Sequence, residues 1–239
     1  MRTICTVIPV FIFLLLSCGK EEKDLMRVEG TVKGLKKGML YLQKIQDTTL
    51  VNIDSLKIDG NSNFSFSVPM ESPEVFYLYL DKNDGNTDND RITFFGERGT
   101  INIHTTRDFF EAEARISGSA SHEKLEEYKK TMSRFNDVNL DLIEALFNAQ
   151  KANDTVTSDS IRRLSGKNRR RSYLYALNFA LHNGDSYVAP YIALSEVAGT
   201  QLKYLDSIYR SLSPEVAASK YGKALGDYIS SRKKGDTGD

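Results

Sequence analysis

The spacing of apolar residues changes once along this chain, and this change constrains the fold more than any other feature. From Arg27 to about Gly118, apolar residues recur with a period close to two, and turn-forming residues separate them at short intervals. This pattern is typical of an all-β sandwich or barrel. Past Ser121 the spacing becomes three and four, which indicates amphipathic helices. We therefore expect an α+β protein, with an antiparallel β-sandwich-like domain over residues 27–118 and a helical domain over residues 119–232.

Eight segments of the first half are expected to be strands. Between two of them, Asp59-Gly60-Asn61 is a strong hairpin signal. Residues 40–42 and 75–80 are apolar at both parities. We expect them near the centre of a sheet, with one face covered by something outside it. The expected strands are residues 27–33, 39–45, 51–58, 63–68, 74–80, 91–95, 100–105 and 112–117.

The second half provides a candidate cover in the form of five helices. The first is expected to begin at Ser121 as its N-cap, with Glu123 in the first turn. The last is expected to begin at Ser213-Pro214, because proline is favoured in the first turn. It is expected to continue from there as one helix. Residues 233–239 are rich in glycine and charge, and we expect a flexible tail. The other three helices are expected near residues 157–183, 186–197 and 201–212.

The N-terminus has the features of an export signal. It begins Met-Arg-Thr and continues with an apolar run over residues 4–16, which is shorter than the about 20 residues that span a membrane. The run ends in Leu15-Leu16-Ser17-Cys18-Gly19, which resembles the lipobox of bacterial lipoproteins. We expect residues 1–17 to be a lipoprotein signal peptide and Cys18 to carry the acyl (palmitate-type) anchor. The alternative is an ordinary signal cut at this junction, which would leave Cys18 as a free thiol.

Residues 18–26 are charged and are expected to form a tether. Lys20-Glu21-Glu22 is similar to the signal that sends Bacteroidetes-type lipoproteins to the outer face of the outer membrane. We therefore expect a protein anchored in the outer membrane that faces the periplasm or the cell surface.

Composition excludes several classes of function. The chain has 32 Lys+Arg against 32 Asp+Glu, which does not fit a strongly basic nucleic-acid binder, so we expect no nucleic-acid partner. Its two cysteines, Cys5 and Cys18, cannot build a disulfide framework or a four-cysteine zinc site.

Several segments resemble the N-terminal domain of unknown function of many Bacteroidetes-type lipoproteins. The most specific are the Asp54-Ser55 pair before a strand, the turn at Gly60, and the strand that contains Phe64-Ser65-Phe66. Further similarity lies in Val28-Glu29-Gly30-Thr31-Val32, Gly38-Met39-Leu40-Tyr41-Leu42, Pro73, Ile116-Ser117-Gly118-Ser119, His182-Asn183-Gly184-Asp185-Ser186-Tyr187-Val188-Ala189 and Ser219-Lys220-Tyr221-Gly222.

In such proteins a thioredoxin-like domain of the peroxiredoxin (AhpC/TSA) or cytochrome-maturation type usually follows. Here the sequence stops at Asp239, where that domain would begin, and it contains no Cys-x-x-Cys. The resemblance therefore implies a fold and a compartment. It transfers no catalytic residue to this chain.

The acidic loop over residues 81–90 places oxygen ligands on alternate positions, as calcium-binding loops do. It departs from the EF-hand pattern, because Asn89 replaces the glycine at the sixth position and Phe95 replaces the glutamate at the twelfth. A solvated hairpin loop is therefore favoured over a calcium site.

The three histidines offer no complete metal motif. His122-Glu123-x-x-Glu126 lacks the second histidine of a zinc helix, and we expect a polar helix N-terminus there. His104 is expected to face solvent, and His182 to lie at a helix end. We assign no catalytic, metal-binding or cofactor-binding residue.

For two further groups of residues, the sequence leaves a binding role open. Tyr77 and Tyr79 share a parity and could line a sheet face that is open to a ligand. A basic cluster could contact lipid headgroups, an anionic glycan or an acidic protein, although a solvated helix face is favoured. The basic cluster consists of Arg162, Arg163, Lys167, Arg169, Arg170 and Arg171.

The leading hypothesis is a lipid-anchored envelope protein that acts as a non-catalytic binding or scaffolding module. Its expected partner is a thioredoxin-like envelope protein or a glycan. The alternative is an accessory fragment of a thiol–disulfide oxidoreductase system that has lost its own thioredoxin-like domain. A third hypothesis is a hydrolase whose site is assembled only by the fold.

Overall fold

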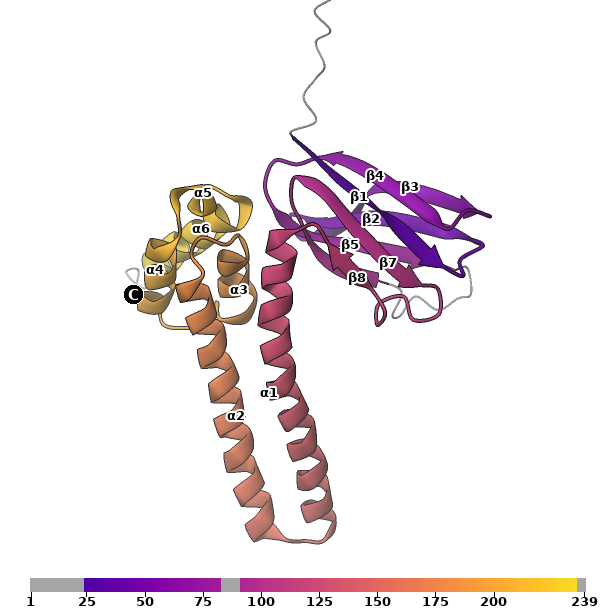
Figure 1. The fold of residues 1–239 in the computed structure, drawn as a ribbon. Helices are drawn as coiled ribbons and strands as arrows, with labels where there is room; N and C mark the ends of the chain where they lie inside the picture. Colours follow the sequence, from indigo (N-terminus) through magenta and orange to yellow (C-terminus); the bar gives the residue numbers. More distant parts are fainter. Residues whose placement is uncertain (1–23, 83–90, 236–239) are drawn as a thin grey trace, which may run out of the picture.

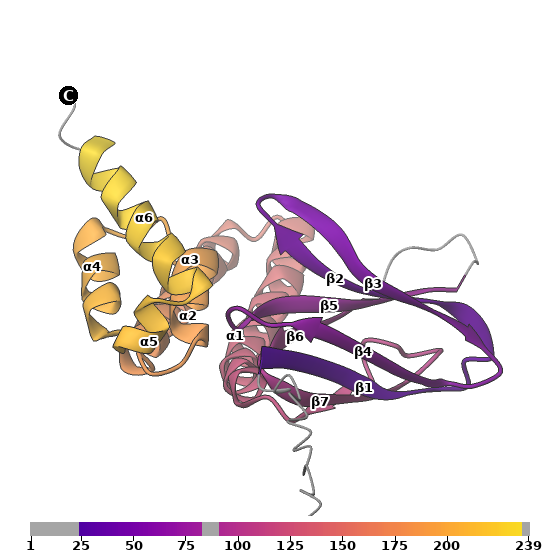
Figure 2. The ribbon, with the colours of Figure 1, turned by 90° about the horizontal axis from the view of Figure 1, so that it is seen from above.

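The order of strands followed by helices is as predicted (Figure 1). The computed structural model describes residues 24–82 and 91–235. The signal peptide, Cys18 and most of the acidic loop lie outside the described residues. The described chain forms a two-sheet β-sandwich and a helical domain that packs beside one end of it (Figure 2).

All eight predicted strands are present, and they form two four-stranded sheets with the orders β4-β1-β7-β8 and β3-β2-β5-β6. The last strand is shorter than predicted, because residues 108–113 form turns. The strands are β1 (Leu25–Lys33), β2 (Lys37–Gln46), β3 (Thr49–Asp59), β4 (Asn63–Pro69), β5 (Glu74–Asp81), β6 (Arg91–Gly96), β7 (Gly99–Thr106) and β8 (Arg115–Ser117).

The predicted antiparallel sandwich is confirmed, with one parallel strand pair as an exception. β1 and β7 pair in parallel, with Val28 opposite Ile101, whereas the other strand pairs are antiparallel. The chain leaves the first sheet after β1 to form β2 and β3, and returns as β4 on one side of β1. It leaves again to form β5 and β6, and returns as β7 on the other side of β1. Parallel strands require such a long connection.

The sandwich core lies between the two sheets. β2 and β5 are the central strands of their sheet, as their apolar residues at both parities predicted. Their inward side chains, such as Leu42 and Leu78, are fully buried in this core. The opposite face at one end of the sheet is covered by the helical domain, where Val75 and Phe95 join a second apolar cluster. The predicted external cover is therefore confirmed at this end.

Six helices follow the strands in the part of the chain that the structure describes. The N-cap of the first is Ser119 and not Ser121 as predicted, because the Ser119 hydroxyl accepts the His122 N–H at 2.9 Å. The predicted last helix is two helices, since the chain turns at Ala218 and Ser219, and the second continues into the tail predicted from Lys233. The helices are α1 (Ala120–Lys151), α2 (Thr155–His182), α3 (Val188–Glu196), α4 (Leu202–Ser211), α5 (Pro214–Ala217) and α6 (Lys220–Gly235).

Helices α1 and α2 form a long antiparallel hairpin. The start of α1 and the end of α2 pack on the rest of the molecule, and the remainder, residues 135–171, projects away from it (Figure 1). We call residues 135–171 the arm. Leu142 and Ile161 lie in the seam between its helices, and Asp154 caps α2 by accepting the Thr157 N–H at 2.9 Å. None of the helices in the described part of the chain combines the length and hydrophobicity of a membrane-crossing segment.

Candidate functional site

A groove of about 870 Å³ lies between the sandwich and the helical domain. The β2–β3 turn and the segments before β5 and after β6 form one wall, and the start of α6 with neighbouring helical residues forms the other. Five acidic and four basic residues line this groove, so it presents both signs of charge to solvent. They are Asp47, Glu71, Glu74, Glu97, Glu215, Lys44, Arg98, Lys220 and Lys223.

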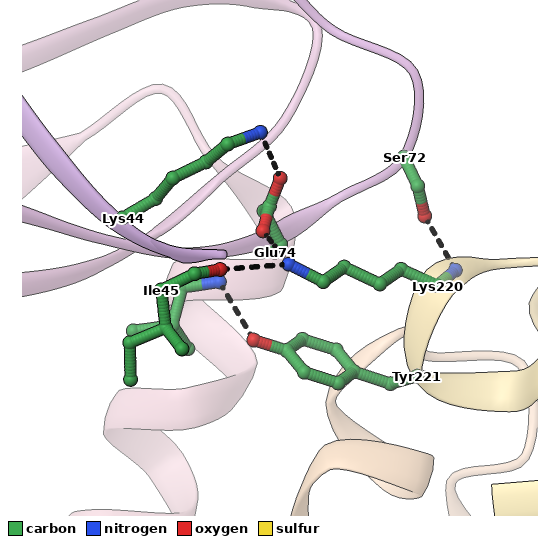
Figure 3. A network of polar contacts seen from close by, with 7 residues as sticks. Lys44, Ile45, Ser72, Glu74, Lys220 and Tyr221 are labelled. Carbon is green, nitrogen blue, oxygen red and sulfur yellow. Dashed lines mark hydrogen bonds and ion pairs between the residues drawn. The ribbon is translucent and has the colours of Figure 1, made fainter. Parts of the chain in front are cut away.

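The centre of the groove wall is a buried carboxylate held by two lysines. Glu74 is only 6% exposed. Its Oε1 accepts from Lys44 Nζ at 3.0 Å, and its Oε2 accepts from Lys220 Nζ (Figure 3). Lys220 Nζ also donates to the carbonyl of Ile45 at 3.2 Å. A buried carboxylate requires such partners, because its desolvation would otherwise be costly.

Two further hydrogen bonds join the same elements. The backbone N–H of Lys220 donates to Ser72 Oγ at 2.8 Å, and the N–H of Val75 donates to the Tyr221 hydroxyl oxygen at 3.2 Å (Figure 3). Burial raises the pKa of Tyr221, so its hydroxyl stays neutral. We call these contacts, with those of Glu74, the interdomain network.

Tyr187 occupies the helical rim of the groove. Its hydroxyl donates to Glu215 Oε1 at 2.5 Å. Burial, together with this hydrogen bond, raises the pKa of Tyr187 to about 12. The phenol therefore remains a protonated donor at neutral pH.

The junction between β6 and α1 contains the buried His122, which corrects the expectation of a polar helix N-terminus. His122 is 4% exposed, and its Nδ1 accepts the Phe95 N–H at 3.4 Å. The Ser119 hydroxyl donates to the Phe95 carbonyl at 2.9 Å. Burial lowers the pKa of His122, and Lys129 adds to this effect while Glu126 opposes it. Two side chains at the start of α1 thus satisfy backbone groups of the edge strand β6.

The other histidines lie where the sequence predicted. His104 is exposed on β7. His182 is in the last turn of α2, with Nδ1 at 2.8 Å from the Asn178 carbonyl oxygen. Among residues 24–82 and 91–235, no group of His, Cys, Asp and Glu is placed to hold a metal ion.

Tyr77 and Tyr79 do share a face of their sheet, but side chains of this chain occupy much of that face. Tyr79 stacks on Tyr41 with ring centroids 5.9 Å apart, and the Arg91 guanidinium lies 5.3 Å from the Tyr79 ring. Tyr77 packs against the apolar cluster of the helical domain. The two tyrosines therefore belong mainly to internal packing.

The basic cluster lies on α2 within the arm, and none of its residues lines the groove. Arg162 pairs with Asp159 at 2.9 Å. Arg163, Lys167 and the run from Arg169 to Arg171 are exposed. The cluster therefore belongs to a separate surface.

Sequence reasoning did not find the groove or the interdomain network. The one local signal is Glu74 itself, a charged residue directly before residues 75–80, which are apolar at both parities. Such a residue needs a partner, but Lys220 lies 146 residues away and no local pattern identifies it.

Comparison with known proteins adds one finding. Residues 26–125 match the model of a family described as a domain of unknown function (DUF4369), and this region contains the sandwich and the start of α1. The match confirms the part of the predicted resemblance that concerns a domain of unknown function. Searches of curated proteins and of solved structures gave no match.

Proposed function

We propose that this protein is a lipid-anchored, non-catalytic module of the cell envelope that binds a partner protein in the groove between its two domains. The observation that carries this proposal is the groove, which lies at a domain interface and displays charges of both signs. Ligand sites occur preferentially at domain interfaces. Electrostatic complementarity with a polypeptide segment that itself carries both signs of charge provides specificity.

The ionisable groups of the groove favour binding over catalysis. Both carboxylate oxygens of Glu74 are bound to lysines. The Tyr187 hydroxyl donates to Glu215, and its pKa is raised away from neutrality. A general acid or base works best with a pKa near the operating pH and with a free position for the proton. These groups therefore fit a structural or recognition role.

The proposed anchor would hold the groove near a membrane. The last tether residue that the structure describes is fixed beside the groove, because Asp24 pairs with Arg98 at 3.2 Å and its carbonyl accepts the Met70 N–H at 2.8 Å. Asp24 lies six positions after Cys18, which corresponds to about 20 Å of extended chain. A partner in the groove would thus be a protein of the same membrane surface.

The anchor is tested by labelling cells with an alkyne fatty acid. The wild-type chain should carry the label and Cys18→Ala should not. Cys5→Ala is the matched control, since it removes the other cysteine of the sequence and should leave labelling unchanged. Label retained by Cys18→Ala would refute the lipid anchor.

The groove is tested by charge reversal at Lys223, which is exposed and lies in the first turn of α6. A glutamate is favourable near a helix N-terminus, so Lys223→Glu should fold normally. In cross-linking and pull-down from native envelopes, the partner captured by the wild type should fall at least about tenfold with Lys223→Glu. Lys57→Glu, which reverses an exposed lysine on β3, is the control and should retain it.

The outcome also identifies the partner class. A thioredoxin-like protein lost with Lys223→Glu would place this chain in a thiol–disulfide system. Equal capture by the wild type and Lys223→Glu would exclude the groove as the binding site.

A further inference from the structure

The arm exposes a row of apolar side chains that its own fold leaves uncovered. Leu140, Ile143 and Phe147 are spaced three and four apart on α1, so they lie along one side of the helix. They are 63%, 55% and 64% exposed, respectively. The seam with α2 uses a different side of α1, which includes Leu142 and Ala149.

The two helices of the arm also carry opposite charges. Between residues 135 and 150 every charged residue of α1 is acidic, and between residues 160 and 171 every charged residue of α2 is basic. On α1 the acids Asp137, Asp141 and Glu144 follow the spacing i, i+4, i+7 and are exposed. The bases Arg163, Lys167 and Arg170 on α2 follow the same spacing and are exposed. Each set therefore forms one row along its helix.

We propose that the arm is a self-association surface, on which a second copy of this chain packs to form a four-helix bundle. In this arrangement the apolar row of each copy is covered by the other, and α1 of one copy lies beside α2 of its partner. The acidic row of each α1 then faces the basic row of the partner's α2, and the two-fold symmetry repeats this contact.

The order of the charges fits this pairing. Helices α1 and α2 run in opposite directions, so two arms that point the same way bring α1 and the partner's α2 together antiparallel. Glu144 then lies near the level of the partner's Arg163, and Asp137 near the level of the partner's Arg170. If the arms pointed in opposite directions, acidic α1 would lie on acidic α1, which is unfavourable.

Arms that point the same way also agree with the proposed anchor. β1 begins at the end of the molecule opposite the tip of the arm (Figure 1). If the two-fold axis runs along the arms, β1 begins at the same end of the dimer in both copies. Both anchors can then enter the same membrane.

The size of the surface indicates a reversible dimer. The α1 part of the arm, residues 135–151, is about 25 Å long at 1.5 Å per residue, and two helices side by side are about 20 Å wide. The contact would bury on the order of 1,000 Å² in total, near the lower limit for a specific interface. Shared anchoring in one membrane would raise the effective concentration of the two copies.

Sedimentation equilibrium tests the proposal with the chain from Cys18 onward, carrying Cys18→Ser so that no lipid is attached. The wild-type body should associate in the micromolar range. The double variant Ile143→Glu/Phe147→Glu should remain monomeric at every concentration, because it places charges in the covered row. Val156→Glu is the control. Val156 is the most exposed large apolar residue of the described chain but lies outside the row, so this variant should still dimerise.

A charge swap tests the pairing of the helices. Glu144→Arg and Arg163→Glu should each weaken association about tenfold, and the two together should restore it. A wild-type chain that is monomeric throughout, or a dimer unaffected by Ile143→Glu/Phe147→Glu, would overturn the proposal. A monomer that sediments with phosphatidylglycerol vesicles, and loses this binding with Arg163→Glu, would overturn it in favour of a membrane surface.

Discussion

Lys220 at the start of α6 binds Glu74 at the start of β5, across the boundary between the helical domain and the sandwich. The two residues are 146 positions apart in the chain. Together with the neighbouring contacts of Ser72 and Tyr221, this pair joins the helical domain to the sandwich.

Replacing Glu74 should loosen this boundary. In Glu74→Gln the two lysine ammonium groups lose their shared carboxylate, although both remain partly exposed and can regain water. We expect the free energy of unfolding in urea to fall by about 1–3 kcal/mol. Glu71→Gln is the control, since Glu71 is an exposed carboxylate in the same groove. Equal losses for the two variants would show that the contacts of Glu74 with Lys44 and Lys220 contribute nothing to stability.

Tyr221→Phe isolates one hydrogen bond of the same boundary. The variant removes the oxygen that accepts the Val75 N–H and leaves the ring in place. We expect a loss of about 1 kcal/mol in the free energy of unfolding. Tyr204→Phe, at an exposed tyrosine of α4, should change it by much less. Hydrogen exchange at Val75 should accelerate only in Tyr221→Phe, and unchanged exchange would contradict this assignment.

The buried His122 predicts a pH dependence of stability. Burial lowers the pKa of His122 in the folded state below its ordinary value of 6.5, so below that pH the unfolded chain binds the proton more readily. Stability is therefore fully present above pH 6.5 and falls as the pH drops towards the folded pKa.

The measurement is the free energy of unfolding from about pH 7.5 to about pH 5.5, for the wild type and His122→Gln. Glutamine can still accept the Phe95 N–H but does not titrate in this range. The wild type should lose more stability than the variant on acidification. Parallel curves would mean that His122 does not titrate differently in the two states.

Two helical glycines should respond to alanine with opposite signs. At Gly222 a Cβ atom would lie 2.1 Å from the Val216 carbonyl oxygen, so Gly222→Ala should destabilise the protein by about 1–3 kcal/mol. At Gly166 a Cβ atom would meet nothing within 4 Å, so Gly166→Ala should stabilise α2 by about 0.5–1 kcal/mol. Thermal unfolding of the two variants checks both signs. A loss at Gly166 would indicate a neighbour that this structure does not show.

The fold was largely predictable because its signals are local. Alternation within each strand, and spacing of three and four within each helix, depend on residues only a few positions apart. The predicted start of α1 was wrong because two nearby residues could both serve as its N-cap. Ser119 and Ser121 are both good N-cap residues, and the choice depends on Glu97, which accepts the Ser121 hydroxyl at 2.6 Å and so occupies it.

The sequence by itself determined the order of strands and helices, the central position of β2 and β5, and the need for an outer cover on their sheet. Only the tertiary structure decided that β1 pairs with β7 in parallel, that His122 is buried, and that Glu74 and Lys220 meet in a groove. The physical reason is the separation along the sequence of the residues that interact. Periodicity follows from the geometry of neighbouring residues, whereas these contacts join residues whose proximity depends on how whole sheets and helices pack.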